Sequence, residues 1–177
     1  MKAYPSFWFT FALLLLSLSG CKGPSLEDKI SARDDTGFEL WISDHRDLFS
    51  PADIKEINTA RQQIRYKVMQ SQPGLPSADL ATAVYKEIDG RTLQELLRTG
   101  YALQIERMKT ELLNYQPQLE RFQAHQQNAS LDEEQKQTVD AALAKLDRLM
   151  REHQEELARL TQRLTELESS SGQPTTK

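Results

Sequence analysis

The stretch Val139–Leu167, VDAALAKLDRLMREHQEELARLTQRLTEL, decides the fold of this chain. Its apolar side chains recur at alternating gaps of four and three residues over about four heptads, which is the pattern of a helix packed along a coiled-coil seam. The seam positions are Val139, Leu143, Leu146, Met150, His153, Leu157, Leu160, Leu164 and Leu167. A long amphipathic helix is therefore predicted, ending near Ser169-Ser170-Ser171-Gly172.

A second apolar stripe with the same alternation precedes this helix. It consists of Tyr101, Ile105, Met108, Leu112, Tyr115, Leu119 and Phe122. Thr92-Leu93-Gln94-Glu95 has the hydroxyl-to-carboxylate spacing of a capping box and predicts the helix start. Pro117 removes one helical hydrogen bond and favours a kink, at about 3 kcal/mol. Because the stripe keeps its phase across Pro117, we expect one kinked helix rather than two separate ones.

The two stripes predict an antiparallel hairpin over residues 92–168. Asn128-Ala129 supplies the turn, and Ser130-Leu131-Asp132-Glu133 predicts another capping box. The stripes have similar lengths, about 50 Å each at 1.5 Å per residue. Pairing of Val139–Leu167 with a second copy remains the alternative, so a homo-oligomer is an open possibility. Leu149 widens the apolar stripe beyond a two-stranded seam, which favours packing against more than one helix.

His153 is the polar residue in the seam, where such residues often set register or oligomeric state. Burial of this imidazole would also make stability depend on pH, which is a hypothesis at this point.

Three shorter helices are expected in a small N-terminal cluster over residues 36–91. Thr36-Gly37-Phe38-Glu39 predicts a capping box for a first helix that reaches about Leu48. Ser50, Pro51 and Asp53 predict the start of a second helix that reaches about Gln70. Ser77 predicts the cap of a third, and Asp89-Gly90 ends it. The expected fold class is all-α: this cluster, the long coiled-coil-like hairpin, and a disordered tail over residues 169–177.

The first 21 residues have the organisation of an export signal. Lys2 precedes an apolar stretch, Phe7–Leu18, that is about a dozen residues long, whereas a membrane-spanning helix needs about 20. Leu18-Ser19-Gly20-Cys21 follows, and Cys21 is the only cysteine of the chain. This run resembles the lipobox of bacterial lipoproteins. The resemblance implies a signal peptide over residues 1–20, cleavage between Gly20 and Cys21, and acylation of Cys21 by diacylglycerol and an amide-linked chain.

The lipobox resemblance also implies a place in the cell. Residues 21–35 would form a lipidated tether, and Lys22, rather than an aspartate, after the cysteine implies the outer membrane, facing the periplasm. The alternative is cleavage elsewhere, with Cys21 left as a free thiol. Phe38–Leu48, Ser50-Pro51 and Ile88-Asp89-Gly90-Arg91-Thr92-Leu93-Gln94-Glu95-Leu96 are similar to small helical envelope lipoproteins of uncharacterised function. That similarity brings no activity or cofactor with it.

The composition and motifs favour a non-enzymatic role. Charged residues make up 27% of the chain with both signs interspersed, so there is no basic face for nucleic acid. Ser43-Asp44-His45-Arg46-Asp47 contains the residue types of a catalytic triad, but neighbours along a helix point in different directions. Phosphate, zinc and calcium motifs are absent from the sequence, so we expect no cofactor, metal or catalytic residue.

We therefore expect a membrane-anchored interaction or structural module that contacts a protein partner through its helical hairpin. The alternative is a periplasmic chaperone-like holdase for unfolded client proteins.

Overall fold

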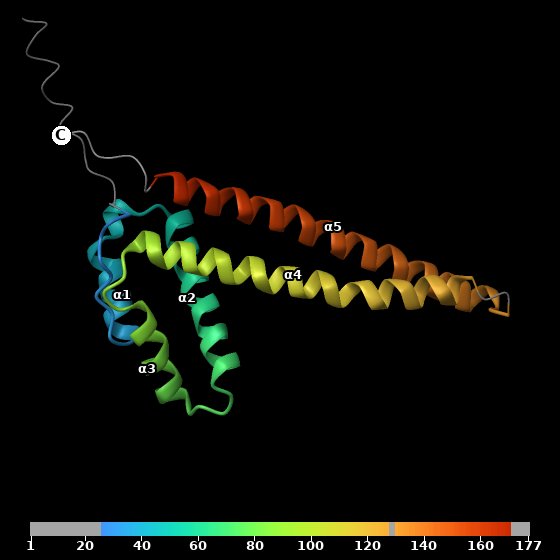
Figure 1. Cartoon of the computed structure of the whole chain (residues 1–177), viewed down its shortest axis with the longest axis horizontal. Coiled ribbons are helices and arrows are strands. Elements are labelled where there is room, and N and C mark those ends of the chain that lie inside the picture. Colours follow the sequence, from blue (N-terminus) through green and yellow to red (C-terminus); the bar gives the residue numbers. More distant parts are fainter. Residues whose placement is uncertain (1–25, 128–129, 171–177) are drawn as a thin grey trace, which may run out of the picture.

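Two long helices form the antiparallel hairpin that the sequence predicts. The computed structural model describes residues 26–127 and 130–170, and the predicted turn Asn128-Ala129 lies outside them. Helix α4 spans Leu93–Gln126 and helix α5 spans Glu133–Ser170. They pack against each other and project together from one end of the molecule (Figure 1). Pro117 lies inside α4, which is a single helix, as expected.

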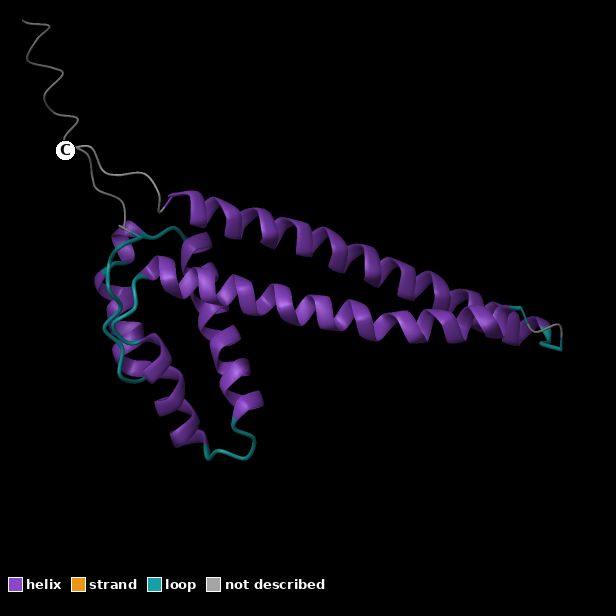
Figure 2. Cartoon of the chain, in the orientation of Figure 1, coloured by secondary structure: helices purple, strands orange, loops and turns teal. Residues whose placement is uncertain are grey.

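The N-terminal cluster contains three further α-helices. Helix α1 spans Asp35–Asp44 and is followed by a 3-10 turn, η1, over Arg46–Leu48. Helix α2 spans Pro51–Ser71, and α3 spans Ser77–Ile88. The all-α fold class is confirmed: the described residues contain helices and loops but no strand (Figure 2). An isolated bridge between Lys29 and Thr92 is their only β-type pairing.

Local capping chemistry explains where the helices start. Thr92 and Glu95 form the predicted capping box of α4, and Ser50 and Asp53 form one at α2 behind Pro51. Two predicted caps are wrong by two residues. Asp34, not Thr36, caps α1 by accepting from the Gly37 N–H at 2.7 Å.

At the start of α5 the reciprocal pair is Asp132 and Gln135 rather than Ser130 and Glu133. Each of these residues bonds the backbone N–H of the other, at 2.8 and 3.1 Å. In both cases the carboxylate of the residue directly before the helix takes the role assigned to a hydroxyl. The third predicted cap is also wrong, because Ser77 is the first residue inside α3.

The predicted tether is shorter than expected, since residues 26–34 pack on the cluster. Ile30 and Ala32 are buried. The Ile30 N–H donates to the Arg91 carbonyl, and the Ile30 carbonyl accepts from Gly90, both at 2.8 Å. Trp41 Nε1 donates to the Lys29 carbonyl at 3.1 Å. A polar composition suggested a free segment, but these backbone bonds fix it along the α3–α4 loop. Residues 21–25 lie outside the described residues.

Helices α2 and α4 cross at very short range. A Cβ atom built on Gly100 of α4 would lie 2.5 Å from Ala60 Cα of α2, inside any allowed contact. The crossing unites the cluster with the hairpin in one core. That core contains Phe38, Ile57, Ile64, Ile88, Leu96 and Leu160, all nearly inaccessible to solvent. The C-terminal part of α5 is thus covered by the cluster.

Candidate interaction surface

The predicted seam residues of α5 all lie at least partly out of solvent. Leu143, Leu146 and Leu160 are buried, and Met150, His153, Leu157 and Leu164 are half-buried. The residues that bury these side chains differ along the helix. Leu160 and Leu167 are 1% and 3% exposed because they join the core of the cluster.

We call the part of the hairpin formed by residues 108–126 and 133–153 the distal hairpin. Met108 at its base is buried, but the apolar side chains of α4 that face the seam beyond it are only half-buried: Leu112, Tyr115, Leu119 and Phe122. Beyond Thr110 and Glu111, which line a groove with α2, the distal hairpin projects away from the cluster, and no other described helix lies against it (Figure 1). Two helices alone therefore shield this seam.

A second row of half-buried residues flanks the seam of α5. Ala142, Leu149, Glu156 and Arg163 are spaced by seven residues and so lie on one helix face. At the proximal end this flank meets α2, where Arg163 pairs with Glu56 at 3.3 Å. In the distal hairpin the same flank carries Ala142 and Leu149 instead. The polar residues thus meet α2, whereas Ala142 and Leu149 lie where α4 is the described helix that covers them in part and α2 does not reach.

An open pocket of about 360 Å³ lies where α2, α4 and α5 meet, and Glu56, Glu156 and Arg159 of its lining take part in ion pairs. Arg159 contacts Glu156 at 2.6 Å and lowers the pKa of that carboxyl. Burial, together with a hydrogen bond to Glu56, raises the pKa of Tyr101 to about 12. Glu156 is paired with Arg159, and Glu56 of α2 is paired with Arg163 of α5. The polar groups at this pocket therefore help to hold α2 and α5 together.

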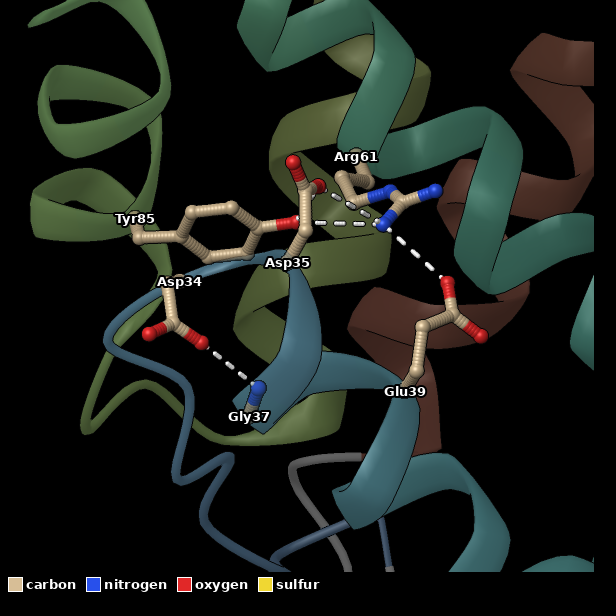
Figure 3. A network of polar contacts seen from close by, with 6 residues as sticks. All are labelled: Asp34, Asp35, Gly37, Glu39, Arg61 and Tyr85. Atoms are coloured by element: carbon tan, nitrogen blue, oxygen red, sulfur yellow. Dashed lines mark hydrogen bonds and ion pairs between the residues drawn. The ribbon is translucent and has the colours of Figure 1, made fainter. Parts of the chain in front are cut away.

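A second polar network joins α1, α2 and α3 (Figure 3). Arg61 of α2 lies 3.4 Å from Asp35, 3.3 Å from Glu39 and 3.1 Å from the Tyr85 hydroxyl. Its guanidinium also stacks 4.8 Å from the centre of the Phe38 ring. Tyr85 of α3 donates to Asp35, and burial, with that bond, raises the Tyr85 pKa to about 12.

The Arg61 network was missed by the sequence analysis. Asp35 and Glu39 are spaced by four residues, which places both carboxylates on one face of α1. That spacing is a local signal for a cation site, but it does not identify Arg61 or Tyr85, which come from two other helices. The network stabilises the cluster and leaves Arg61 fully engaged.

His45 has a structural position rather than the geometry of a triad. Its ring lies against Trp41 and Phe49, and Nδ1 is 2.7 Å from the Trp41 carbonyl. The aromatic residues Phe38 and Trp41 are buried in the same cluster. Within the described ranges, no group of three or more His, Cys, Asp and Glu side chains is placed to hold a metal ion.

His153 is the seam residue with the most polar contacts. Its ring meets the edge of the Tyr115 ring, and its two nitrogens lie near the Leu149 carbonyl and the Glu111 carboxylate. This arrangement joins α5 to α4 in the middle of the hairpin.

Gly20 and Cys21, the predicted cleavage and lipidation positions, lie outside the described residues. In the part of the chain that is described, none of the helices combines the length and apolar character needed to cross a bilayer. No protein-family model, curated protein or solved structure matches this chain.

Proposed function

We propose that this chain is a non-enzymatic envelope lipoprotein whose distal hairpin docks a protein partner by accepting an amphipathic helix. The observation that carries the proposal is the pair Ala142 and Leu149, which is apolar and only half-buried where the proximal equivalents Glu156 and Arg163 are polar and meet α2. A partner helix on this flank would occupy the position that α2 occupies proximally.

The chemistry of the flank defines the partner. Packing apolar side chains in a groove between two helices stabilises a complex by about 25 cal/mol per Å² of apolar surface removed from water. The matching surface is a helix with apolar residues at spacings of three and four. Tyr115 of α4 is also half-buried in the distal hairpin, where its ring contacts His153.

The placement of the chain ends supports a tethered arrangement. Residue 26, where the described chain begins, and the end of α5 lie at the end opposite to the hairpin tip (Figure 1). A lipid on Cys21 would therefore hold the cluster near the membrane. The 38 residues of α5 would place the tip about 57 Å away, at 1.5 Å per residue. We propose the periplasmic face of the outer membrane as the location.

Position-specific photo-crosslinking in intact cells tests the docking function. A photoreactive amino acid is placed at Ala142 or Leu149, and the matched control is Ala144, an exposed alanine on the same helix. We expect one discrete protein adduct from positions 142 and 149 and none from 144. Equal labelling at all three positions, or no labelling, would contradict the proposal. A broad ladder of unfolded proteins would instead support the holdase alternative.

A substitution provides the complementary test. Leu149→Glu introduces a charge into the proposed docking flank and should abolish the adduct formed from position 142. Ala144→Glu should leave that adduct unchanged. Circular dichroism melting of both variants separates lost docking from lost folding, and retention of the adduct by a folded Leu149→Glu protein would argue against this surface.

A further inference from the structure

Three side chains form a connected polar cluster in the hairpin. His153 Nε2 of α5 lies 3.1 Å from Glu111 Oε2 of α4. The other carboxylate oxygen of Glu111 lies 3.7 Å from Arg107 Nε, also on α4. The side chains of His153, Glu111 and Arg107 are 22%, 41% and 39% exposed, so the cluster is at the edge of the hairpin rather than in bulk water.

The two ring nitrogens of His153 both face acceptors. Nδ1 lies 2.9 Å from the Leu149 carbonyl, and Nε2 faces the Glu111 carboxylate. A carbonyl and an ionised carboxylate accept hydrogen bonds but cannot donate them. A neutral imidazole carries one N–H, so it can satisfy only one of these two contacts. Both hydrogen bonds exist together only when the ring carries two protons.

Arg107 lacks a hydrogen-bond acceptor, whereas His153 has two. Its Nε atom is buried and has no hydrogen-bond partner, since the 3.7 Å separation from Glu111 is too long for a hydrogen bond. A buried donor without an acceptor is costly. A modest displacement of the Glu111 carboxylate toward Arg107 would supply Oε1 as that acceptor and would move Oε2 away from His153.

We propose that Glu111 is a two-position, proton-controlled switch. With His153 doubly protonated, Glu111 binds His153 and joins α4 to α5, as in this structure. With His153 neutral and its proton on Nδ1, the Nε2 lone pair repels the carboxylate, and Glu111 transfers its hydrogen bond to Arg107 Nε. The step moves one proton from His153 to solvent and breaks no covalent bond.

The switch also affects the contact between α4 and α2, because Arg107 lies against α2. Its guanidinium lies 5.5 Å from the centre of the Tyr66 ring on α2. Both residues line an open groove of about 540 Å³ between α2 and α4. The proton-bound state therefore strengthens the α4–α5 contact, and the proton-free state fixes the arginine that bridges α4 and α2.

Other charged groups near His153 are accounted for. On α4 the facing groups are Glu111, Arg107 and the Tyr115 ring. On α5 itself the charged neighbours in sequence are Arg151, Glu155 and the ion pairs Arg148–Glu152 and Arg159–Glu156. On α2 the charged contact to α5 is Glu56–Arg163, ten residues further along α5. The shared carboxylate of Glu111 is the acidic group in direct contact with the ring.

Unfolding by denaturant between pH 5 and 8 tests the first half of the switch. Histidine changes charge in this range. Relative to Glu111→Gln, the folding equilibrium constant of the wild-type protein should fall about fivefold as pH rises, because the charge-assisted bond between α5 and α4 is replaced by a bond within α4. Comparing variants cancels the contributions of His45 and His125. Glu152→Gln, which alters an exposed carboxylate one residue away, should keep the wild-type profile. Parallel profiles for wild type and Glu111→Gln would overturn the proposal.

Nuclear magnetic resonance tests the second half on the purified protein. Relative to free arginine at the same pH, the exchange of the Arg107 Nε–H with water should be strongly slowed at pH 8 and little slowed at pH 5. His153→Leu retains an apolar seam and frees Glu111, so its Arg107 Nε–H should be protected at both pH values. Nitrogen spectra of the His153 ring should show two N–H groups at pH 5 and the Nδ1–H tautomer at pH 8. An Nε2–H tautomer at pH 8, or unprotected Arg107 throughout, would overturn the switch.

Discussion

Gly100 shows how a single side chain, or its absence, sets the relation between two helices. The helix of α4 alone would favour alanine here, because glycine lowers helix stability by about 1 kcal/mol. The contact with Ala60 reverses that preference, since an added Cβ would meet the backbone of α2. We expect Gly100→Ala to lower the free energy of unfolding by about 1–3 kcal/mol, the usual effect of overpacking.

Denaturant unfolding measures this effect, and Gly37→Ala is the control. A Cβ on Gly37 would lie 3.4 Å from Asp34 Oδ1 and 3.6 Å from Ala32 Cα, which is ordinary contact. Its effect on stability should therefore be small. A Gly100→Ala protein as stable as wild type would show that α2 and α4 can separate at their crossing without loss.

Tyr85 makes stability depend on alkaline pH at the same scale. Its pKa is raised from 10.0 to about 12, so folding favours the neutral phenol. This contribution is complete below pH 10, where the phenol is neutral in both states. It is lost as pH rises from about 10 through about 12, because the unfolded chain ionises first. Tyr101 shifts in the same direction and adds to the slope.

We expect Tyr85→Phe to reduce that slope and to cost about 1 kcal/mol at neutral pH through loss of the bond to Asp35. Unfolding free energies measured at intervals from pH 8 to 12 provide the comparison. Tyr101→Phe should reduce the slope independently. If each variant kept the full wild-type dependence on alkaline pH, neither buried phenol would be responsible for it.

At the scale of the element, α4 is a long helix that continues through a proline. Pro117 is exposed and lacks the N–H that would bond the Leu113 carbonyl. Pro117→Ala should restore that bond and raise the free energy of unfolding by about 1–3 kcal/mol, as thermal or denaturant unfolding would record. Gln116→Ala, its exposed neighbour, should change stability by less than about 0.5 kcal/mol. A destabilised Pro117→Ala protein would mean that packing on α5 requires the proline.

The long elements were predictable from the sequence because their signals are local and repeated. The stripes of α4 and α5 each contain at least seven apolar positions in phase, and capping boxes mark Thr92 and Ser50. Helix caps were harder to predict where several polar side chains lie close to the start of a helix. Asp34 lies two residues before Thr36, and both residue types are common N-caps, so the backbone path decides which of them caps α1.

The candidate surface could be predicted in outline only. Periodicity identified Leu149 as an extra apolar position. Which part of that α5 face is covered by α2 depends on how α2 crosses α4, and the sequence does not show that crossing. The Arg61 network and the Glu111–His153 contact join residues 22 to 50 positions apart in the chain. Spacing along one helix carries no information about such partners, which is why the paired residues were not foreseen.

At the scale of the whole molecule, the described chain begins at the end opposite to the projecting hairpin tip (Figure 1). Residues 26–34 are fixed to the α3–α4 loop, which leaves only residues 21–25 between Cys21 and the folded domain. A lipid on Cys21 would therefore keep the cluster close to the bilayer and would not act through a long flexible tether. The hairpin, not the tether, would supply reach.

Replacement of Cys21 tests this arrangement directly. Acyl chains add about 0.8 kcal/mol of membrane affinity per buried CH₂ group, and stable anchoring needs two such signals. We expect wild-type protein to incorporate labelled palmitate and to sediment with outer membranes, whereas Cys21→Ser should incorporate none and accumulate as an uncleaved precursor. Ser25→Ala, which lies outside the lipobox, should behave as wild type. Wild-type protein that is soluble and unlabelled would refute the anchor, while the crosslinks from Ala142 and Leu149 would still report independently on docking by the hairpin.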